Sequence, residues 1–243
     1  MRHIRYVLYH CFALVLCCSA TPVNAIYIDY DASVMPNNHT DPFSYVEFSS
    51  TSGSVSGGEL TLTTAPAEGI WFGKYNHPSF AVPWNLAPSS DGNYLSVTAK
   101  LAPLATEWSM YFYDGAHFAG LGLIDNHTIE ITKYHTPTGN LETQLIAVDT
   151  TEYHQYELLL KDGLVTYRLD GSTVLYHGDA YPTTFSNTLV IGDGSGSMIS
   201  GTGSMMIDHV VFQTSPDFMI VPEPALFSVL LCVGSLLLVQ RRV

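Results

Sequence analysis

Four aromatic residues have side chains suited to a sugar platform: Tyr111, Tyr113, Trp71 and Trp84. Flat apolar rings with polar edges match the faces of pyranose rings, and nearby Asn, Asp or His side chains can then bond the hydroxyl groups. These four residues are the candidate carbohydrate-binding positions. The alternative is that they are half-buried aromatic residues of strands and bind no ligand.

Four aspartates are candidate ligands of a metal ion: Asp29, Asp31, Asp193 and Asp208. Carboxylate and carbonyl oxygens are the ligands that Ca²⁺ takes in proteins, so a structural Ca²⁺ is the cofactor that these residues suggest. The alternative is that the aspartates cap turns and face water.

Sequence motifs of catalysis are missing. The chain has no Gly-x-Ser-x-Gly, no His-Glu-x-x-His, no P-loop and no dinucleotide-binding fingerprint. All four cysteines lie in the terminal segments, so the body of the chain offers no thiol nucleophile. The histidines of the body are scattered without the spacing of metal ligands. We therefore expect the protein not to be an enzyme.

Short strands are the elements that position these residues. Apolar and polar residues alternate over 59–64, 94–101 and 107–113, and 118–124, 128–134 and 143–148 are further strand candidates. In the third of these runs, Trp108, Met110 and Phe112 are expected to face the core, which places Ser109, Tyr111 and Tyr113 on the opposite face.

Two Asp-Gly pairs predict the clearest local structure. Asp162-Gly163 separates the alternating runs 156–161 and 164–169, and Asp170-Gly171 separates the second run from 172–177. Type I′ turns need positive φ at both central positions, which Asp-Gly supplies, so these three runs predict a meander of antiparallel strands. Residues 189–191 and 204–212 complete the strand candidates, with a glycine-rich loop between them.

This meander, the Ile191-Gly192-Asp193-Gly194 loop and the last strand with Ile207-Asp208 resemble the laminin-G and concanavalin A-like lectin/glucanase superfamily. The resemblance implies an all-β fold, an antiparallel jelly-roll β-sandwich over 26–214, with one concave sheet. It also implies that the first and last strands are neighbours, which would bring Asp29 or Asp31 near Asp208. Glycosidases of this superfamily carry Glu-x-Asp-x-x-Glu on one strand, and this chain has no such string; around Glu130 there is one carboxylate without a partner.

The C-terminal segment, 215–243, carries a sorting motif. Val221-Pro222-Glu223-Pro224 precedes an apolar run over 225–239, and Arg241-Arg242 follow it. The prolines exclude a continuous helix, and the run is expected to be a transmembrane helix with its basic end in the cytoplasm. The segment resembles the PEP-CTERM sorting signal of Gram-negative bacteria, which implies an exosortase as the processing partner and the inner membrane as a temporary anchor.

The N-terminal segment, 1–25, has the features of a signal peptide. Arg2 and Arg5 precede an apolar region, and Val23-Asn24-Ala25 is a small-residue cleavage site, so we expect cleavage between Ala25 and Ile26. The protein is then exported, first as a membrane-anchored precursor and later to the cell surface or extracellular matrix.

Charge excludes one class of function. The whole chain has a net charge of −13, and removing both terminal segments leaves five basic against 21 acidic residues, a net charge of −16. Such a surface repels nucleic acid. Because exosortase substrates are associated with extracellular polysaccharide, the resemblance implies a non-catalytic adhesive role in biofilm or floc. The alternatives are a carbohydrate-binding module with a specific glycan site and a divergent glycoside hydrolase.

Overall fold

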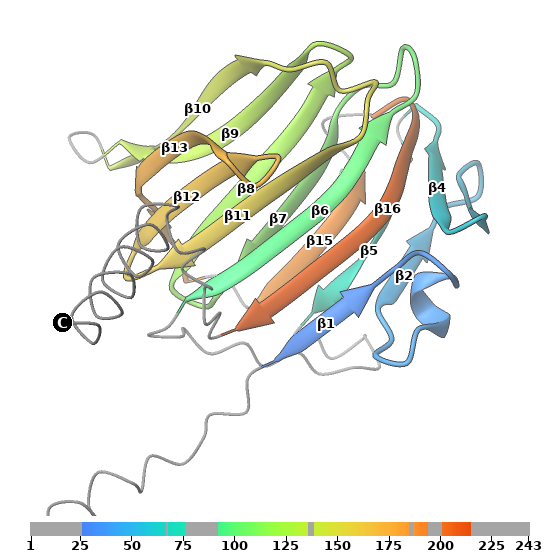
Figure 1. Ribbon diagram of the computed structural model, residues 1–243, viewed down its shortest axis with the longest axis horizontal. Coiled ribbons are helices and arrows are strands. Elements are labelled where there is room, and N and C mark those ends of the chain that lie inside the picture. The colour runs from blue at the N-terminus through green and yellow to red at the C-terminus, as the bar shows by residue number, and fades with distance from the viewer. Residues whose placement is uncertain are drawn as a thin grey trace, which may run out of the picture.

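A computed structural model describes residues 26–66, 68–75, 92–135, 139–184, 187–193 and 201–214. These residues form two antiparallel β-sheets, which Figure 1 shows as stacked layers. Apart from the short 3₁₀ helix η1 (Pro36–Asn38), the regular structure of this part of the chain is strand. The signal peptide, the sorting motif and the predicted transmembrane helix over 225–239 lie outside the described residues, as does Trp84.

Sheet A contains eight strands within the described part of the chain. In spatial order they are β13 (Thr173–Asp179), β12 (Leu164–Leu169), β11 (His154–Lys161), β6 (Asn93–Leu101), β16 (Gly203–Thr214), β4 (Glu59–Thr64) and β3 (Ser52–Ser56), and β1 (Tyr27–Tyr30) pairs with β16. The first and last strands are therefore neighbours, as expected. Within these described ranges, no helix has the length and apolar character needed to cross a membrane.

Sheet B also contains eight strands among the described residues. Their order is β10 (Asn140–Ala147), β9 (Thr128–His135), β8 (His117–Asp125), β7 (Trp108–Tyr113), β15 (Thr188–Asp193), β5 (Ile70–Tyr75) and β2 (Ser44–Glu47), and β14 (Tyr181–Pro182) pairs with β8. Strands distant in sequence thus become neighbours, since β15 lies between β5 and β7.

The predicted meander is confirmed. β11, β12 and β13 pair in order, and β12 has the predicted bounds. Asp162 and Gly163 have φ of 53° and 75°, and Asp170 and Gly171 have 53° and 72°, so both turns have the positive φ pair of type I′ geometry.

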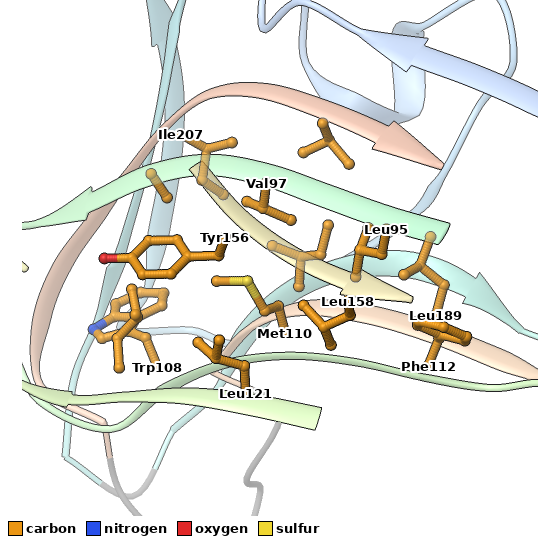
Figure 2. Packing of buried hydrophobic residues seen from close by; sticks show 14 of the residues in the cluster. Leu95, Val97, Trp108, Met110, Phe112, Leu121, Tyr156, Leu158, Leu189 and Ile207 are labelled. Atoms are coloured by element: carbon orange, nitrogen blue, oxygen red, sulfur yellow. The ribbon is translucent and has the colours of Figure 1, made fainter. Parts of the chain in front are cut away.

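One core lies between the sheets. The predicted inward residues of β7, Trp108, Met110 and Phe112, are fully buried. Figure 2 shows them packed beneath residues of sheet A, among them Tyr156 and Leu158. Each strand alternates, so burying one face leaves the other outward. Three of the predicted sugar-binding residues, Trp71, Tyr111 and Tyr113, lie on the outer face of sheet B.

Candidate functional site

The outer face of sheet B is built by the alternation of its central strands. On β7 the buried positions leave Ser109, Tyr111 and Tyr113 outward. On β8 Ala119, Leu121 and Leu123 are buried, which leaves the residues between them on the same outer face as Tyr111: Phe118, Gly120, Gly122 and Ile124. Of the two glycines in this set, Gly120 is covered by the ring of Phe118, whose Cζ would lie 2.6 Å from a Cβ there, whereas at Gly122 the nearest atom is Cδ1 of Ile124 at 3.2 Å.

A row of five residues crosses the sheet in register, and we name it the glycine row: Trp71, Gly192, Ser109, Gly122 and Glu130. Gly192 pairs with Trp71 on one side and Ser109 on the other. Gly122 pairs with Ser109 and with Glu130. With strands about 4.8 Å apart, the row extends roughly 19 Å from Trp71 to Glu130.

The two glycines have different reasons for lacking a side chain. Gly192 has a φ of +132°, and a Cβ there would lie 2.5 Å from the carbonyl oxygen of Ile70 and 2.7 Å from the Cα of Trp71, so the backbone requires glycine. At Gly122 the φ is ordinary and the nearest atom is Cδ1 of Ile124 at 3.2 Å. The chain could accept a side chain at Gly122, and its absence leaves the row open.

A cavity of about 530 Å³ lies over this part of the sheet. It is lined by residues of β7, β8 and β9 together with Glu107, which precedes β7, and Asp193 of β15. Its lining includes three members of the glycine row, namely Ser109, Gly122 and Glu130. A volume of this size is within the range of ligand pockets, and a concave mixture of apolar and polar groups is their usual character.

Aromatic rings form one wall of the cavity. Tyr111 and Phe118 line it, with ring centroids 5.9 Å apart. Tyr113 continues the cluster, 5.8 Å from Tyr111 in a T-shaped arrangement and 4.7 Å from Phe118. Burial raises the pKa of Tyr111 to about 12 and also raises that of Tyr113, so both hydroxyls remain protonated donors at neutral pH.

Three carboxyl groups line the same cavity: Glu107, Glu130 and Asp193. Asp193 is 1% exposed and accepts a hydrogen bond from the Thr64 hydroxyl of β4 in sheet A at 2.9 Å, so its carboxylate is tied to the opposite sheet. Glu107 immediately precedes β7 and has a φ of +62°, a left-handed conformation that costs about 1–2 kcal/mol for a residue with a side chain. Its backbone N–H donates to the carbonyl of Ile124, which fixes this turn against β8.

The structure brings together part of the predicted sugar platform. Tyr111 and Tyr113 share one cluster, and Trp71 emerges on the same face, two strands away from β7. Sequence reasoning missed Phe118, Glu107 and the two glycines of the row. A signal existed for Gly122, because Gly120 and Gly122 occupy alternate positions in a predicted strand.

The four predicted metal ligands do not meet. The carboxylate of Asp29 bonds to His209, and that of Asp31 accepts from the backbone N–H of Ser33. Asp193 belongs to sheet B, whereas Asp208 belongs to β16 of sheet A. In the part of the chain that the structure describes, no group of three or more His, Cys, Asp or Glu residues could hold a metal ion. These side chains therefore do not fit the predicted Ca²⁺ site as a set.

Comparison with known proteins identifies the fold. No protein-family model and no curated protein match the chain. Solved structures do match. They include SCLam, a non-specific endo-β-1,3(4)-glucanase of family GH16, with a TM-score of 0.53 and 12% identity over 81% of this chain and 93% of that one. The Crh5 transglycosylase in complex with NAG matches with a TM-score of 0.54 and 14% identity over 78% of this chain and 84% of its own.

A third structure is a GlcNAcα1-4Gal-releasing endo-β-galactosidase from Clostridium perfringens, with a TM-score of 0.52 and 10% identity over 79% of this chain and 62% of that one. The fold is the concanavalin A-like jelly roll. The all-β antiparallel sandwich that the sequence predicted is thereby confirmed for the described residues.

The functional expectation requires a correction. These solved structures are a glucanase, a transglycosylase and an endo-β-galactosidase, so the interpretation of the chain as a non-catalytic adhesive surface protein is wrong as the leading one. The fold and the cavity fit the glycan-site alternative better. The expectation that the protein is not an enzyme likewise loses its support, because the neighbours of the fold are enzymes.

Proposed function

We propose that the outer face of sheet B binds a glycan chain laid along the glycine row, across the strands. The observation that carries this proposal is the coincidence of the 530 Å³ cavity with an aromatic wall and a floor of glycine. Gly122 lines the cavity without a side chain, which lets a sugar ring approach the sheet there. Tyr111 and Phe118 then offer apolar faces beside it.

Polar groups along the row supply the hydrogen bonds that a sugar requires. The Ser109 hydroxyl already donates to the carbonyl of Gly192 at 3.2 Å and retains acceptor capacity. The Glu130 carboxylate accepts from hydroxyls, and protonated Tyr111 can donate. The row carries the Trp71 ring at one end, the Ser109 hydroxyl in the middle and the Glu130 carboxylate at the other end. Its length of roughly 19 Å suits a chain of several sugar residues rather than one monosaccharide.

The test is glycan binding by the full-length protein, measured on a glycan array and then by titration calorimetry with the strongest glycan. Tyr111→Ala should weaken binding about tenfold, which corresponds to about 1.4 kcal/mol. The matched control is Tyr27→Ala, since Tyr27 is 60% exposed on sheet A. Equal losses of glycan affinity in the two variants, or no glycan bound by the wild-type protein, would contradict the proposal. Thermal melting checks that each variant is folded at the assay temperature.

A second candidate function is hydrolysis of the bound glycan. The specific observation is that Glu107, Glu130 and Asp193 line one cavity although they come from three separate segments. Glycoside hydrolysis needs two carboxyl groups about 5–10 Å apart, one as acid and the other as nucleophile or base. On β7 itself, the outward positions facing the cavity are Ser109 and Tyr111, so any such pair would be formed between strands.

Release of reducing sugar from β-glucans and β-galactans separates hydrolysis from binding. If the protein is a hydrolase, Glu130→Gln and Glu107→Gln should each lower the rate at least about a hundredfold, the usual scale of acid–base catalysis. Glu152→Gln, an exposed residue outside the cavity, should leave the rate unchanged. No release above that of heat-denatured protein would leave binding as the function.

A further inference from the structure

We propose that Glu107 and Glu130 determine specificity by charge, so that the cavity accepts uncharged glycans and rejects glycans carrying uronate or sulfate groups. This inference rests on the proposed glycan site and names the class of chain that enters it. The argument begins with the charges that line the cavity. Three of its lining residues are carboxylic acids, and none of those that the structure describes there is Lys or Arg.

The Lys and Arg residues of the domain lie away from the cavity. Lys74 is buried against Asp41, with its Nζ 2.6 Å from the carboxylate. Lys100 lies over the ring of Tyr153, 4.4 Å from the centroid, and belongs to β6 of sheet A. The other two basic residues of sheet A are Lys161 and Arg168. No basic residue of sheet A can reach the outer face of sheet B, because the core separates them.

Lys133 is the cation nearest in sequence to the site. It lies on β9, three residues after Glu130. Successive side chains of a strand point to opposite faces, so Lys133 has the orientation of the buried Ile129 and Ile131, whereas Glu130 faces outward. It pairs in register with Glu142 of β10. Glu130 therefore has no basic neighbour on its own face of β9.

An anionic sugar would meet uncompensated repulsion at this site. Two unit charges about 6 Å apart repel by roughly 1–3 kcal/mol at an effective dielectric constant between 20 and 40, which is about a five- to hundredfold loss of affinity. A neutral hydroxyl at the same position is instead a donor to the carboxylate, and hydrogen bonds to charged acceptors are the stronger ones. The same side chains thus attract one class of glycan and exclude the other.

The experiment uses a matched pair of probes with the full-length protein. One probe is a neutral mixed-linkage β-glucan, and the other is the same polymer with its primary alcohols oxidised to carboxylates. Affinities are measured at low ionic strength and again at about 1 M salt, where the Debye length falls from roughly 10 Å at 0.1 M to 3 Å. We expect the neutral polymer to bind at least about tenfold more tightly, and the preference to shrink in salt.

Substitutions then assign the effect to the cavity. Glu130→Gln and Glu107→Gln should each shift the ratio of the two affinities by about three- to tenfold toward the oxidised polymer. Glu152→Gln removes the same charge from an exposed position outside the cavity and should hardly change the ratio. A shift in both cavity variants and not in the control supports the inference.

Two results would overturn the charge selectivity. They differ in whether they also contradict the proposed glycan site. If the oxidised polymer binds as tightly as the neutral one, the charge selectivity is wrong while the proposed glycan site stands. If no neutral glycan binds under any of these conditions, the glycan site and the selectivity are removed together.

Discussion

The carboxylate of Asp29 and the imidazole Nε2 of His209 lie 2.5 Å apart and join the first strand of the domain to the last. The hydrogen bond from His209, followed by that from Tyr27, lowers the pKa of Asp29 below its ordinary value of 3.8. The folded state therefore favours the ionised carboxylate. Its stabilisation is present above pH 4 and is lost as the pH falls through the lowered pKa.

Asp29→Asn should consequently lower the free energy of unfolding at neutral pH and have a vanishing effect near pH 2. Both side chains are more than 40% exposed, so screening limits the loss to about 0.5 kcal/mol. Denaturant unfolding at pH 7 and pH 2 measures the difference. Asp208→Asn, which removes a charge from β16 without touching this contact, is the control; the same pH-dependent loss in both variants would contradict the assignment.

The ion pair between Lys74 and Asp41 should lose different amounts of stability depending on which partner is removed. The lysine side chain is 2% exposed, donates to Asp41 at 2.6 Å and to the carbonyl of Pro42 at 2.7 Å, and lies 5.2 Å from the ring of Phe43. Asp41→Ala leaves a buried ammonium without its carboxylate and should cost about 2 kcal/mol. Lys74→Met leaves only the half-exposed Asp41, which water can solvate, and should cost less than about 1 kcal/mol.

Chemical denaturation of both variants tests this asymmetry, with Asp41→Asn as an intermediate that keeps the shape and one acceptor oxygen of the aspartate. Equal losses from Asp41→Ala and Lys74→Met would show that the pair acts through packing alone. A larger loss from Lys74→Met would contradict the prediction outright.

Local chemistry explains which strands could be predicted from the sequence. The bounds of β4 and β12 match the prediction because each alternates regularly and β12 lies between two Asp-Gly turns. β5 was not predicted from the sequence because Lys74 occupies an inward position and breaks the alternation of apolar residues. β3 was not predicted either, because its sequence is Ser-Gly-Ser-Val-Ser, which presents almost no apolar face.

The candidate site was predictable only in part because its members are distant in sequence. Tyr111 and Tyr113 alternate on one strand, so spacing placed them on one face. Glu130 had no carboxylate partner within its own strand, and the other two carboxyl groups of the cavity come from segments that only the sheet order brings near it. Nor does spacing show that Gly192 lies between Trp71 and Ser109, since that requires β15 to insert between β5 and β7.

The glycine row allows binding and stability to be separated by two substitutions. At Gly122 the nearest atom to an added Cβ is the flexible Cδ1 of Ile124 at 3.2 Å, and the next two, the Trp108 carbonyl oxygen and the Glu130 Cβ, lie at ordinary contact distances of 3.7 and 3.8 Å. Gly122→Val should therefore fill the row and weaken glycan binding by about tenfold or more while costing about 1 kcal/mol of stability. At Gly192 the positive φ and the backbone contacts of 2.5 and 2.7 Å forbid a Cβ, so Gly192→Ala should destabilise the fold by about 2 kcal/mol or more.

Calorimetric titration and thermal melting of both variants test this separation. Gly53→Ala is the control for a side chain added on sheet A, away from the glycine row. The Tyr45 hydroxyl would lie 2.0 Å from its Cβ, so Tyr45 must rotate, and some stability should be lost while glycan binding stays unchanged. Unchanged glycan binding in a folded Gly122→Val variant would show that the glycan does not follow the glycine row.

We propose that both terminal segments are removed by proteolysis, and the described fold is compatible with their removal. Ile26 and Thr214, the first and last described residues, are joined by two hydrogen bonds, from Ile26 N to the Thr214 hydroxyl at 2.8 Å and from Thr214 N to the Ile26 carbonyl at 2.9 Å. Removing 1–25 and the segment after the Pro222-Glu223-Pro224 motif would therefore leave every described strand intact.

Intact mass and N-terminal sequencing of protein from a bacterium with an exosortase should give a chain that begins at Ile26 and lacks 225–243. Replacing Pro222 and Pro224 with alanine should retain the tail, because a continuous helix could then extend into the extended segment that the protease requires. A chain recovered from the cell interior with both ends present would contradict both predicted cleavages.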